Sequence, residues 1–239
     1  MSVDLLSHIR IVLSHTSHPG NIGAAARAMK TMGIGALYLV NPKKFPHAEA
    51  DAMATSTAAD VLQRARVCTT LAEALEGTVY ALALSARRRE LAYASADARS
   101  AVQVLVGAAQ AGEVALVFGT EMSGLTNEEI LQCRAAAHIP ADPACSSLNL
   151  AAAVQVMTYE ARMAALGAQA LAATESAPAR HEDVENFYVH LEESLLASGF
   201  LDPYNPKRLI PRLRRLFGRA CLEQEEVNIL RGMLGSFRK

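Results

Sequence analysis

EVALVFGTEMSGLTNEEI, residues 113–130, contains in succession the patterns of a strand, a glycine-containing loop and the start of a helix. The run EVALVFG has strand length, and the Thr-x-x-Glu pair in TNEEI has the spacing of a helix capping box. Gly119 and Gly124 permit close backbone approaches that a Cβ atom would block. The loop is therefore expected at the carboxyl end of a strand, where open α/β sheets bind ligands. Glu121 is a candidate site residue there, and the alternative is a glycine turn with an exposed carboxylate.

Five further apolar runs of strand length alternate with helical stretches between residues 10 and 166. They are RIVLS (10–14), LYLV (37–40), RVCTT (66–70), VYALALS (79–85) and AAHIP (136–140). The runs are nearly continuous in apolar character, which is typical of strands covered on both faces. Together with the intervening helices they predict an α/β fold with a mostly parallel sheet of six strands.

The last third of the chain changes in composition. A long helix is predicted over residues 148–166, after which GAQALAATESAPAR loses helical periodicity and reads as a linker. Two amphipathic helices follow, and Asn205-Pro206 predicts the cap and first residue of a third, short helix between them. We expect a first domain over 1–168, a linker over 169–180 and a small helical extension over 181–239.

Composition narrows the function classes. The net charge of −1 excludes a globally basic nucleic-acid binder and leaves only local basic patches. Four cysteines without a C-x-x-C pair and seven histidines without H-E-x-x-H spacing argue against a metal site and fit a reducing cytoplasm. The sequence shows no signal-peptide pattern and no apolar run of membrane-spanning length, so we expect a soluble, cytoplasmic protein. It also lacks the dinucleotide, P-loop and G-x-S-x-G motifs.

NIGAAARAMKTMG, residues 21–33, reads as a helix that ends at Gly33. Its apolar stripe, expected to dock on the sheet, consists of Ile22, Ala26 and Met29. Arg27 lies off that stripe, on the same side as Gly23, where little bulk surrounds it. Two interpretations stay open at this point: Arg27 faces a phosphate-bearing substrate, or it is an ordinary surface arginine on an alanine-rich helix.

IPADPACSSLNLAAAV, residues 139–154, leads from a strand through a proline-broken loop into the long helix. Ser146 or Ser147 is a natural N-cap, because a serine hydroxyl accepts from the amide two or three residues onward. The other serine is then available to a ligand. Asn149 falls in the first turn of the predicted helix.

Two basic stretches are candidates for RNA contact. LSARRRELAY, residues 84–93, places three arginines directly after a strand. PKRLIPRLRRLFGR, residues 206–219, carries six positive charges and no acid: Lys207, Arg208, Arg212, Arg214, Arg215 and Arg219. Either stretch grips phosphates or is a solvated surface.

Taken in order, N-x-G-x-x-x-R-A, F-G-x-E-x-x-G-L and P-x-x-x-S-S-L-N-L-A-x-A-V resemble the three motifs of the SpoU/TrmH class of RNA ribose 2′-O-methyltransferases in the SPOUT superfamily. Within that class, TSHPGNIGAAARAMKTMG and SARRR are similar to the TrmJ type, which methylates cytidine or uridine at position 32 of the tRNA anticodon loop. The resemblance covers residues 8–166. It implies a C-terminal trefoil knot in the sheet domain, a homodimer with shared active sites, and tRNA as partner.

The resemblance also implies roles for individual residues. S-adenosyl-L-methionine would be held by Leu84, Ser85, Ala86, Gly119, Ile139, Ser146, Ser147 and Leu148. The catalytic residues would be Asn21, Arg27, Glu121, Ser147 and Asn149, with Glu121 orienting Arg27 or its partner. RNA would be bound by Arg87 and Arg88. The basic stretch 206–219 predicts Lys207, Arg208 and Arg212 as further RNA contacts, independently of the resemblance. The alternatives are a ribosomal RNA 2′-O-methyltransferase of the same class and a catalytically silent RNA-binding module.

Overall fold

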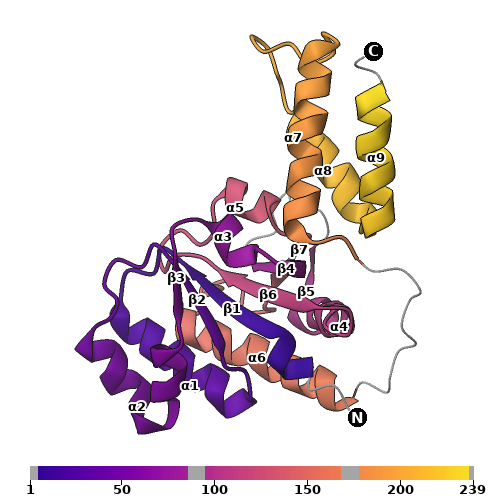
Figure 1. Ribbon diagram of the computed structural model, residues 1–239. Coiled ribbons are helices and arrows are strands. Elements are labelled where there is room, and N and C mark those ends of the chain that lie inside the picture. The colour runs from indigo at the N-terminus through magenta and orange to yellow at the C-terminus, as the bar shows by residue number, and fades with distance from the viewer. Residues whose placement is uncertain (1–4, 86–94, 168–177, 237–239) are drawn as a thin grey trace.

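The computed structural model describes residues 5–85, 95–167 and 178–236. Its elements are η1 (Leu5–His8), β1 (Ile9–Ser14), α1 (Pro19–Met32), β2 (Ala36–Val40), α2 (Ala48–Gln63), β3 (Arg66–Cys68), α3 (Leu71–Leu75), β4 (Thr78–Leu84), β5 (Ser95–Asp97), α4 (Ala98–Ala108), β6 (Glu113–Phe118), α5 (Asn127–Leu131), β7 (Ala135–His138), α6 (Leu150–Gly167), α7 (His181–Ala197), α8 (Leu209–Ala220) and α9 (Gln224–Ser236). Figure 1 shows their arrangement.

The strands form one sheet in the order β3-β2-β1-β6-β4-β7-β5, and each pairing between these strands is parallel. The predicted α/β class with a mostly parallel sheet is confirmed. The prediction of six strands was one short, because it missed β5. This strand has three residues, none of them fully buried, and lies at the sheet edge, so it carries no apolar run to detect. Since the strands are parallel, all their carboxyl ends meet at the same edge of the sheet.

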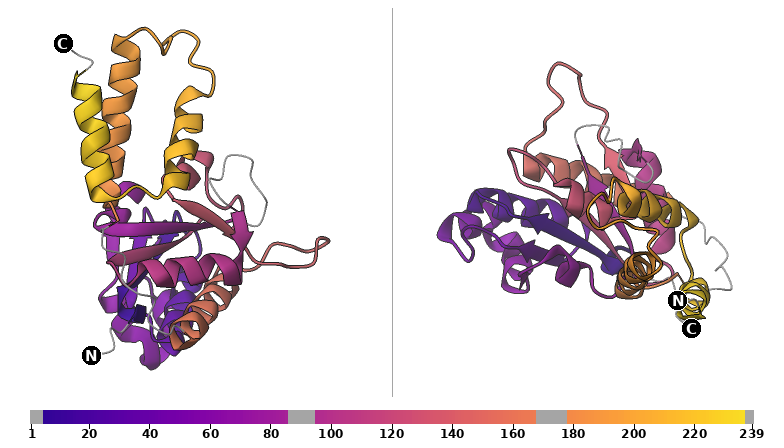
Figure 2. Two further views of the ribbon diagram at one scale, coloured as in Figure 1. Left: turned by 90° about the vertical axis from the view of Figure 1, so that its right-hand side faces the viewer. Right: turned by 90° about the horizontal axis from the view of Figure 1, so that it is seen from above.

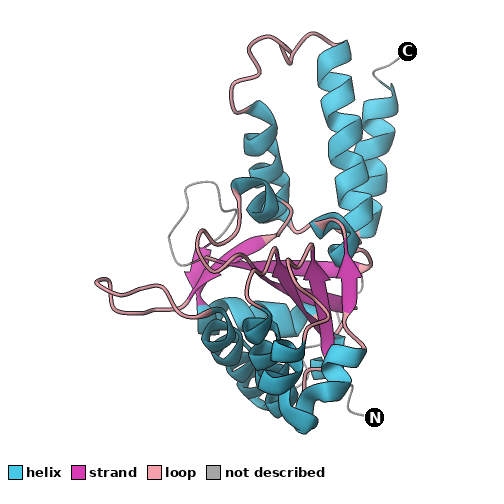
Figure 3. Cartoon of the chain, turned by 90° about the vertical axis from the view of Figure 1, so that its left-hand side faces the viewer, coloured by secondary structure: helices cyan, strands magenta, loops and turns pink. Residues whose placement is uncertain are grey.

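Successive strand residues feed two separate cores. In β1, Ile11 and Leu13 belong to the core under α1, α2, α4 and α6, whereas Val12 belongs to the core under α3 and α5. Both sheet faces are therefore covered, which explains the continuous apolar runs in the sequence. Figure 3 shows the sheet between these two layers.

Helix α1 docks as its apolar stripe predicts: Ile22, Ala26 and Met29 are fully buried, and Gly33 ends the helix in the left-handed conformation. The structure gives the small size of Gly23 a packing role. A Cβ atom on Gly23 would lie 2.0 Å from the carbonyl oxygen of Ala50. Gly23 is thus required for the close approach of α2 and does not clear space for a substrate beside Arg27.

Helices α7, α8 and α9 form a helical extension on the α3/α5 side of the sheet (Figure 1), with α7 and α9 side by side (Figure 2). Its own core contains Phe187, Tyr188, Leu191, Leu222 and Val227. The predicted start of the middle helix at Asn205-Pro206 was wrong, because α8 begins at Leu209. The domain boundaries at 168 and 180 stay a prediction, since residues 168–177 lie outside the described residues.

Candidate active site

A cavity of about 480 Å³ opens at the carboxyl ends of β4, β6 and β7. It brings together residues from three distant stretches of sequence, including seven of the predicted cofactor residues: Leu84, Ser85, Gly119, Ile139, Ser146, Ser147 and Leu148. The eighth, Ala86, lies outside the described residues, as do Arg87 and Arg88. Phe118, Leu125 and Leu150 add apolar surface to the walls, while Thr120 and Ser123 add hydroxyls.

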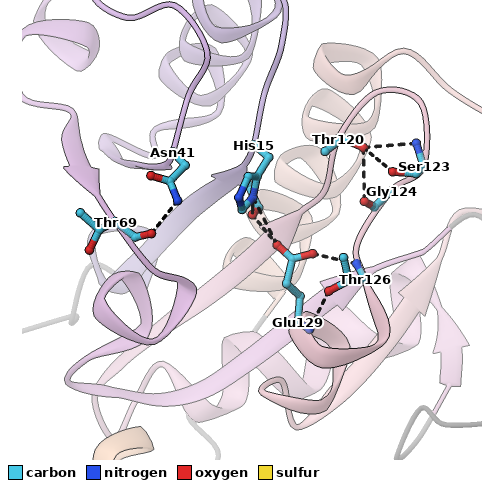
Figure 4. A network of polar contacts seen from close by, with 9 residues as sticks. His15, Asn41, Thr69, Thr120, Ser123, Gly124, Thr126 and Glu129 are labelled. Atoms are coloured by element: carbon cyan, nitrogen blue, oxygen red, sulfur yellow. Dashed lines mark hydrogen bonds and ion pairs between the residues drawn. The ribbon is translucent and has the colours of Figure 1, made fainter.

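The loop between β6 and α5 forms one wall of the cavity and is tightly closed on itself. Thr120 and Gly124 exchange backbone hydrogen bonds of 3.2 and 3.0 Å, and the Thr120 hydroxyl lies 2.8 Å from that of Ser123 (Figure 4). Gly119 allows this closure, because a Cβ atom there would lie 2.1 Å from the carbonyl carbon of Gly124. Gly124 has a φ of +69°, a conformation that side-chain-bearing residues rarely adopt.

Glu121 anchors this loop to the N-terminus of α1. Its carboxylate accepts hydrogen bonds from the backbone N–H and hydroxyl of Ser17 (3.1 and 2.7 Å), from the backbone N–H of His18 (3.1 Å) and from Asn21 Nδ2 (3.0 Å). Partial burial opposes ionisation of Glu121, but the hydrogen bonds from Asn21 and Ser17 outweigh it and lower its pKa to about 2. Glu121 is therefore an anion at neutral pH, held by donors at and just before the start of α1 and not by Arg27.

Asn149 caps α6 and joins it to α1. Its Oδ1 accepts from the backbone N–H groups of Ala151 (2.9 Å) and Ala152 (3.4 Å), while its Nδ2 donates to Asn21 Oδ1 at 3.0 Å. The expectation that Ser146 or Ser147 caps this helix was wrong, because the helix begins at Leu150, too far along the chain for either serine. Both serines line the cavity instead.

A second polar link, which was not predicted, joins the end of β1 to α5. The Ser14 hydroxyl donates to Glu129 Oε1 and lies 2.8 Å from Nδ1 of His15, and Glu129 also closes the capping box with Thr126 (Figure 4). His15 is held at a φ of +53°, which is strained for a residue other than glycine. Ser14 and Glu129 are 115 positions apart, so no local pattern in the sequence could have paired them.

Arg27 lies on the exposed side of α1 and does not line the cavity of its own chain. Within the described residues, its guanidinium makes no hydrogen bond or ion pair. In the extension, Lys207, Arg208 and Arg212 are exposed, whereas Arg214 is paired with Glu185 through contacts of 2.8 and 2.6 Å. The described part of the chain contains no cluster of three potential metal ligands, and none of its helices could cross a membrane.

Comparison with known proteins decides the family. The SpoU rRNA Methylase family model matches residues 8–159, which include the three motifs and the cavity. The chain belongs to this family. The model of the C-terminal domain of tRNA methyltransferase TrmJ matches residues 182–239, so the resemblance to the TrmJ type is confirmed as well.

Relatives of this SpoU family member match along nearly its whole length. The tRNA (cytidine/uridine/adenosine-2′-O-)-methyltransferase TrmJ of Pseudomonas aeruginosa (strain UCBPP-PA14) is 50% identical over 98% of this chain and 95% of its own. The crystal structure of TrmJ from Z. mobilis ZM4 superposes with a TM-score of 0.84 at 32% identity, covering 96% of this chain and 99% of that one. An AdoMet-bound rRNA methyltransferase from Sinorhizobium meliloti has a TM-score of 0.52 at 25% identity, over 65% of this chain and 56% of that one.

Proposed function

We propose that this chain is an S-adenosyl-L-methionine-dependent tRNA (cytidine/uridine-2′-O-)-methyltransferase acting at position 32 of the anticodon loop. The observation that carries the proposal is the cavity at the carboxyl ends of β4, β6 and β7. It gathers residues of the second and third motifs of a family whose TrmJ members match nearly the whole chain. The proposal places the enzyme in the cytoplasm with its tRNA substrate, and it retains the trefoil knot as a prediction.

The cavity residues fit the cofactor. A volume of about 480 Å³ lies within the range of small-molecule sites. Apolar side chains such as Ile139 and Leu148 suit a nucleobase, and the hydroxyls of Ser85, Ser146 and Ser147 suit a ribose and charged groups. When bound, S-adenosyl-L-methionine supplies a methyl group on a sulfonium centre. The protein has to align the ribose 2′-oxygen with it, and such alignment can contribute roughly 7 to 11 kcal/mol to lowering a barrier.

Arg27 is assigned the positioning of the RNA. An arginine stays protonated in proteins, so it is no general base, but its planar fork binds a phosphate through two parallel hydrogen bonds. Such a grip on the phosphate next to the target ribose orients the 2′-hydroxyl and favours its ionisation. Asn21, Glu121, Ser147 and Asn149 are assigned to shaping the same crevice.

Because Arg27 is exposed on α1 and absent from the cavity lining, the proposal requires a second copy of the chain to supply it.

A homodimer with shared sites can be tested by mixing two inactive variants. Arg27→Ala and Ile139→Arg are each expected to abolish activity alone, since one removes the phosphate grip and the other fills the cavity. When the two inactive variants are mixed and their subunits exchange, half of the dimers contain one subunit of each variant. Each of these dimers has one intact site out of two, so the mixture is expected to regain about a quarter of wild-type activity. A mixture as inactive as its parents would contradict the shared site.

The test of the reaction is mass-spectrometric mapping of methylated nucleosides after incubation with the cofactor and unmodified tRNA. We expect one 2′-O-methylpyrimidine at position 32. Methylation at another nucleotide would correct the position, and no 2′-O-methylated nucleoside would overturn the proposal. Calorimetric binding of the cofactor separates an inactive preparation from a silent RNA-binding module, which would not bind it.

A ribosomal RNA substrate is the second candidate, favoured by the description of the matched family as rRNA methylases. The match of residues 182–239 to the TrmJ C-terminal domain favours tRNA. Label uptake into tRNA compared with ribosomal RNA under the same conditions distinguishes the two.

A further inference from the structure

Met122 is the apolar residue that the loop between β6 and α5 presents to solvent. Its side chain is 97% exposed, whereas Met53 and Met233 elsewhere on the surface are about half covered, at 49% and 51%. Single exposed apolar residues are common on protein surfaces and do not by themselves indicate a functional site. Met122 differs because it also lines the cavity, so a large apolar side chain stands at the cavity mouth.

The backbone on both sides of Met122 is fixed. Glu121 is held by four hydrogen bonds from the α1 end, and the Ser123 backbone N–H donates to the Thr120 hydroxyl at 3.2 Å. Gly119 packs against the backbone of Gly124 and leaves the loop no room to collapse inward. The loop therefore cannot withdraw Met122 from the mouth without breaking several of these bonds.

The proposed reaction puts a nucleotide at this position. A methyl donor inside the cavity is reached only from the mouth, so the acceptor ribose stands there and its base extends over the rim. The flat face of a base is apolar and polarisable, and a methionine thioether packs well on such a face. Contact with the face, unlike hydrogen bonding to the edge, accepts any base, because every base has such a face.

We propose that Met122 is a substrate-contacting residue that packs against the face of the target nucleobase and supports cytidine and uridine alike. This inference rests on the proposed methyltransferase function. It assigns acceptance of either pyrimidine to a shared apolar contact at the mouth of the site.

The test compares Met122→Ala with wild type on tRNA transcripts that carry either cytidine or uridine at the target position. We expect kcat/KM to fall about fivefold, by the same factor for both transcripts. Met122→Leu, which keeps an apolar side chain of similar size, is expected to retain most of the activity. Met53→Ala removes a half-exposed methionine from α2 and serves as the matched control, with no expected change. Cofactor affinity by calorimetry and dimer mass by sedimentation are expected to be unchanged in all variants.

When the wild-type enzyme is active, each other outcome overturns the inference. Wild-type kcat/KM in Met122→Ala would show that the side chain touches no substrate. A loss of cofactor affinity would place Met122 against the cofactor, and a change in sedimenting mass would place it between subunits. A fall for only one of the two transcripts would replace face contact by edge recognition. Absence of methylated nucleoside with the wild-type enzyme would count against the proposed function instead, so the two failures remain distinct.

Discussion

Asn21 Nδ2 donates to a Glu121 carboxylate oxygen at 3.0 Å, although 100 positions separate the two residues. The ionised carboxylate only accepts hydrogen bonds, so it fixes which end of the Asn21 amide faces it. Asn21 Oδ1 is then left to accept from Asn149 Nδ2, whose own oxygen caps α6. A chain of hydrogen bonds through the Asn21 and Asn149 amides thus connects the three sequence motifs. The negative charge of Glu121 determines which atom of each amide donates and which accepts.

Glu121→Gln is expected to destabilise the protein by about 2 kcal/mol in urea unfolding, because one amide oxygen replaces a carboxylate that accepts four hydrogen bonds. The effect depends on pH. The folded-state pKa of about 2 lies below the ordinary value of 4.5, so the carboxylate stabilises the fold above pH 4.5 and this contribution is lost as pH falls toward 2. The stability difference between wild type and variant is therefore expected to narrow over that range.

Glu128→Gln is the matched control, since Glu128 is exposed on α5 in the adjoining stretch of chain. Its unfolding free energy is expected to stay near wild type at every pH tested. An equal loss of unfolding free energy in both variants would mean that removal of a negative charge by itself causes the effect, and not the loss of the hydrogen bonds that Glu121 accepts.

The same glycine-to-alanine substitution is expected to affect stability differently at two positions of α1. In Gly23→Ala the new Cβ atom meets the backbone oxygen of Ala50 at 2.0 Å, so α1 and α2 have to separate and we expect a loss of about 3 kcal/mol. In Gly20→Ala the nearest atom is Glu49 Oε1 at 2.7 Å, at the end of a flexible side chain that can turn away. This variant is expected to unfold near the wild-type temperature or slightly above it. Equal destabilisation would contradict the role given to α2.

The sequence predicts those parts of the molecule that local patterns determine. Six strands, the end of α1 at Gly33 and the Thr126–Glu129 capping box each have a signature within a few residues. The features that it did not reveal depend on distant partners. Gly23 has a reason only once α2 lies against it, and the capping role of Asn149 follows from where α6 begins. The start of α8 was misplaced because a local Asn-Pro signal was not followed by a helix there.

Arg134 is expected to hold the helical extension against the sheet. Its Nη2 donates to the backbone carbonyls of Ala179 and Leu222, both at 3.3 Å, and so connects the end of α5 and start of β7 to both edges of the extension. Arg134→Met removes these bonds, and we expect faster hydrogen exchange at the Ala179 amide, which is bonded to Leu222. Arg180→Met, at an exposed neighbouring arginine, is the control. Unchanged exchange in Arg134→Met would show that the apolar contacts suffice.

Arg212 and Arg214 are two residues apart in α8 and differ in their surroundings. Arg212 is exposed, so Arg212→Ala is expected to weaken tRNA binding and to reduce the salt dependence of affinity by about one phosphate contact, with unchanged thermal stability.

Arg214 is bound to Glu185 at 2.8 and 2.6 Å and lies 4.3 Å from the centre of the Tyr188 ring. Arg214→Ala leaves Glu185 without this partner, so it is expected to lower the unfolding temperature of the extension. Binding measured over a salt series, with thermal unfolding of both variants, separates the two roles. The reverse pattern would mean that α8 presents its other face to RNA.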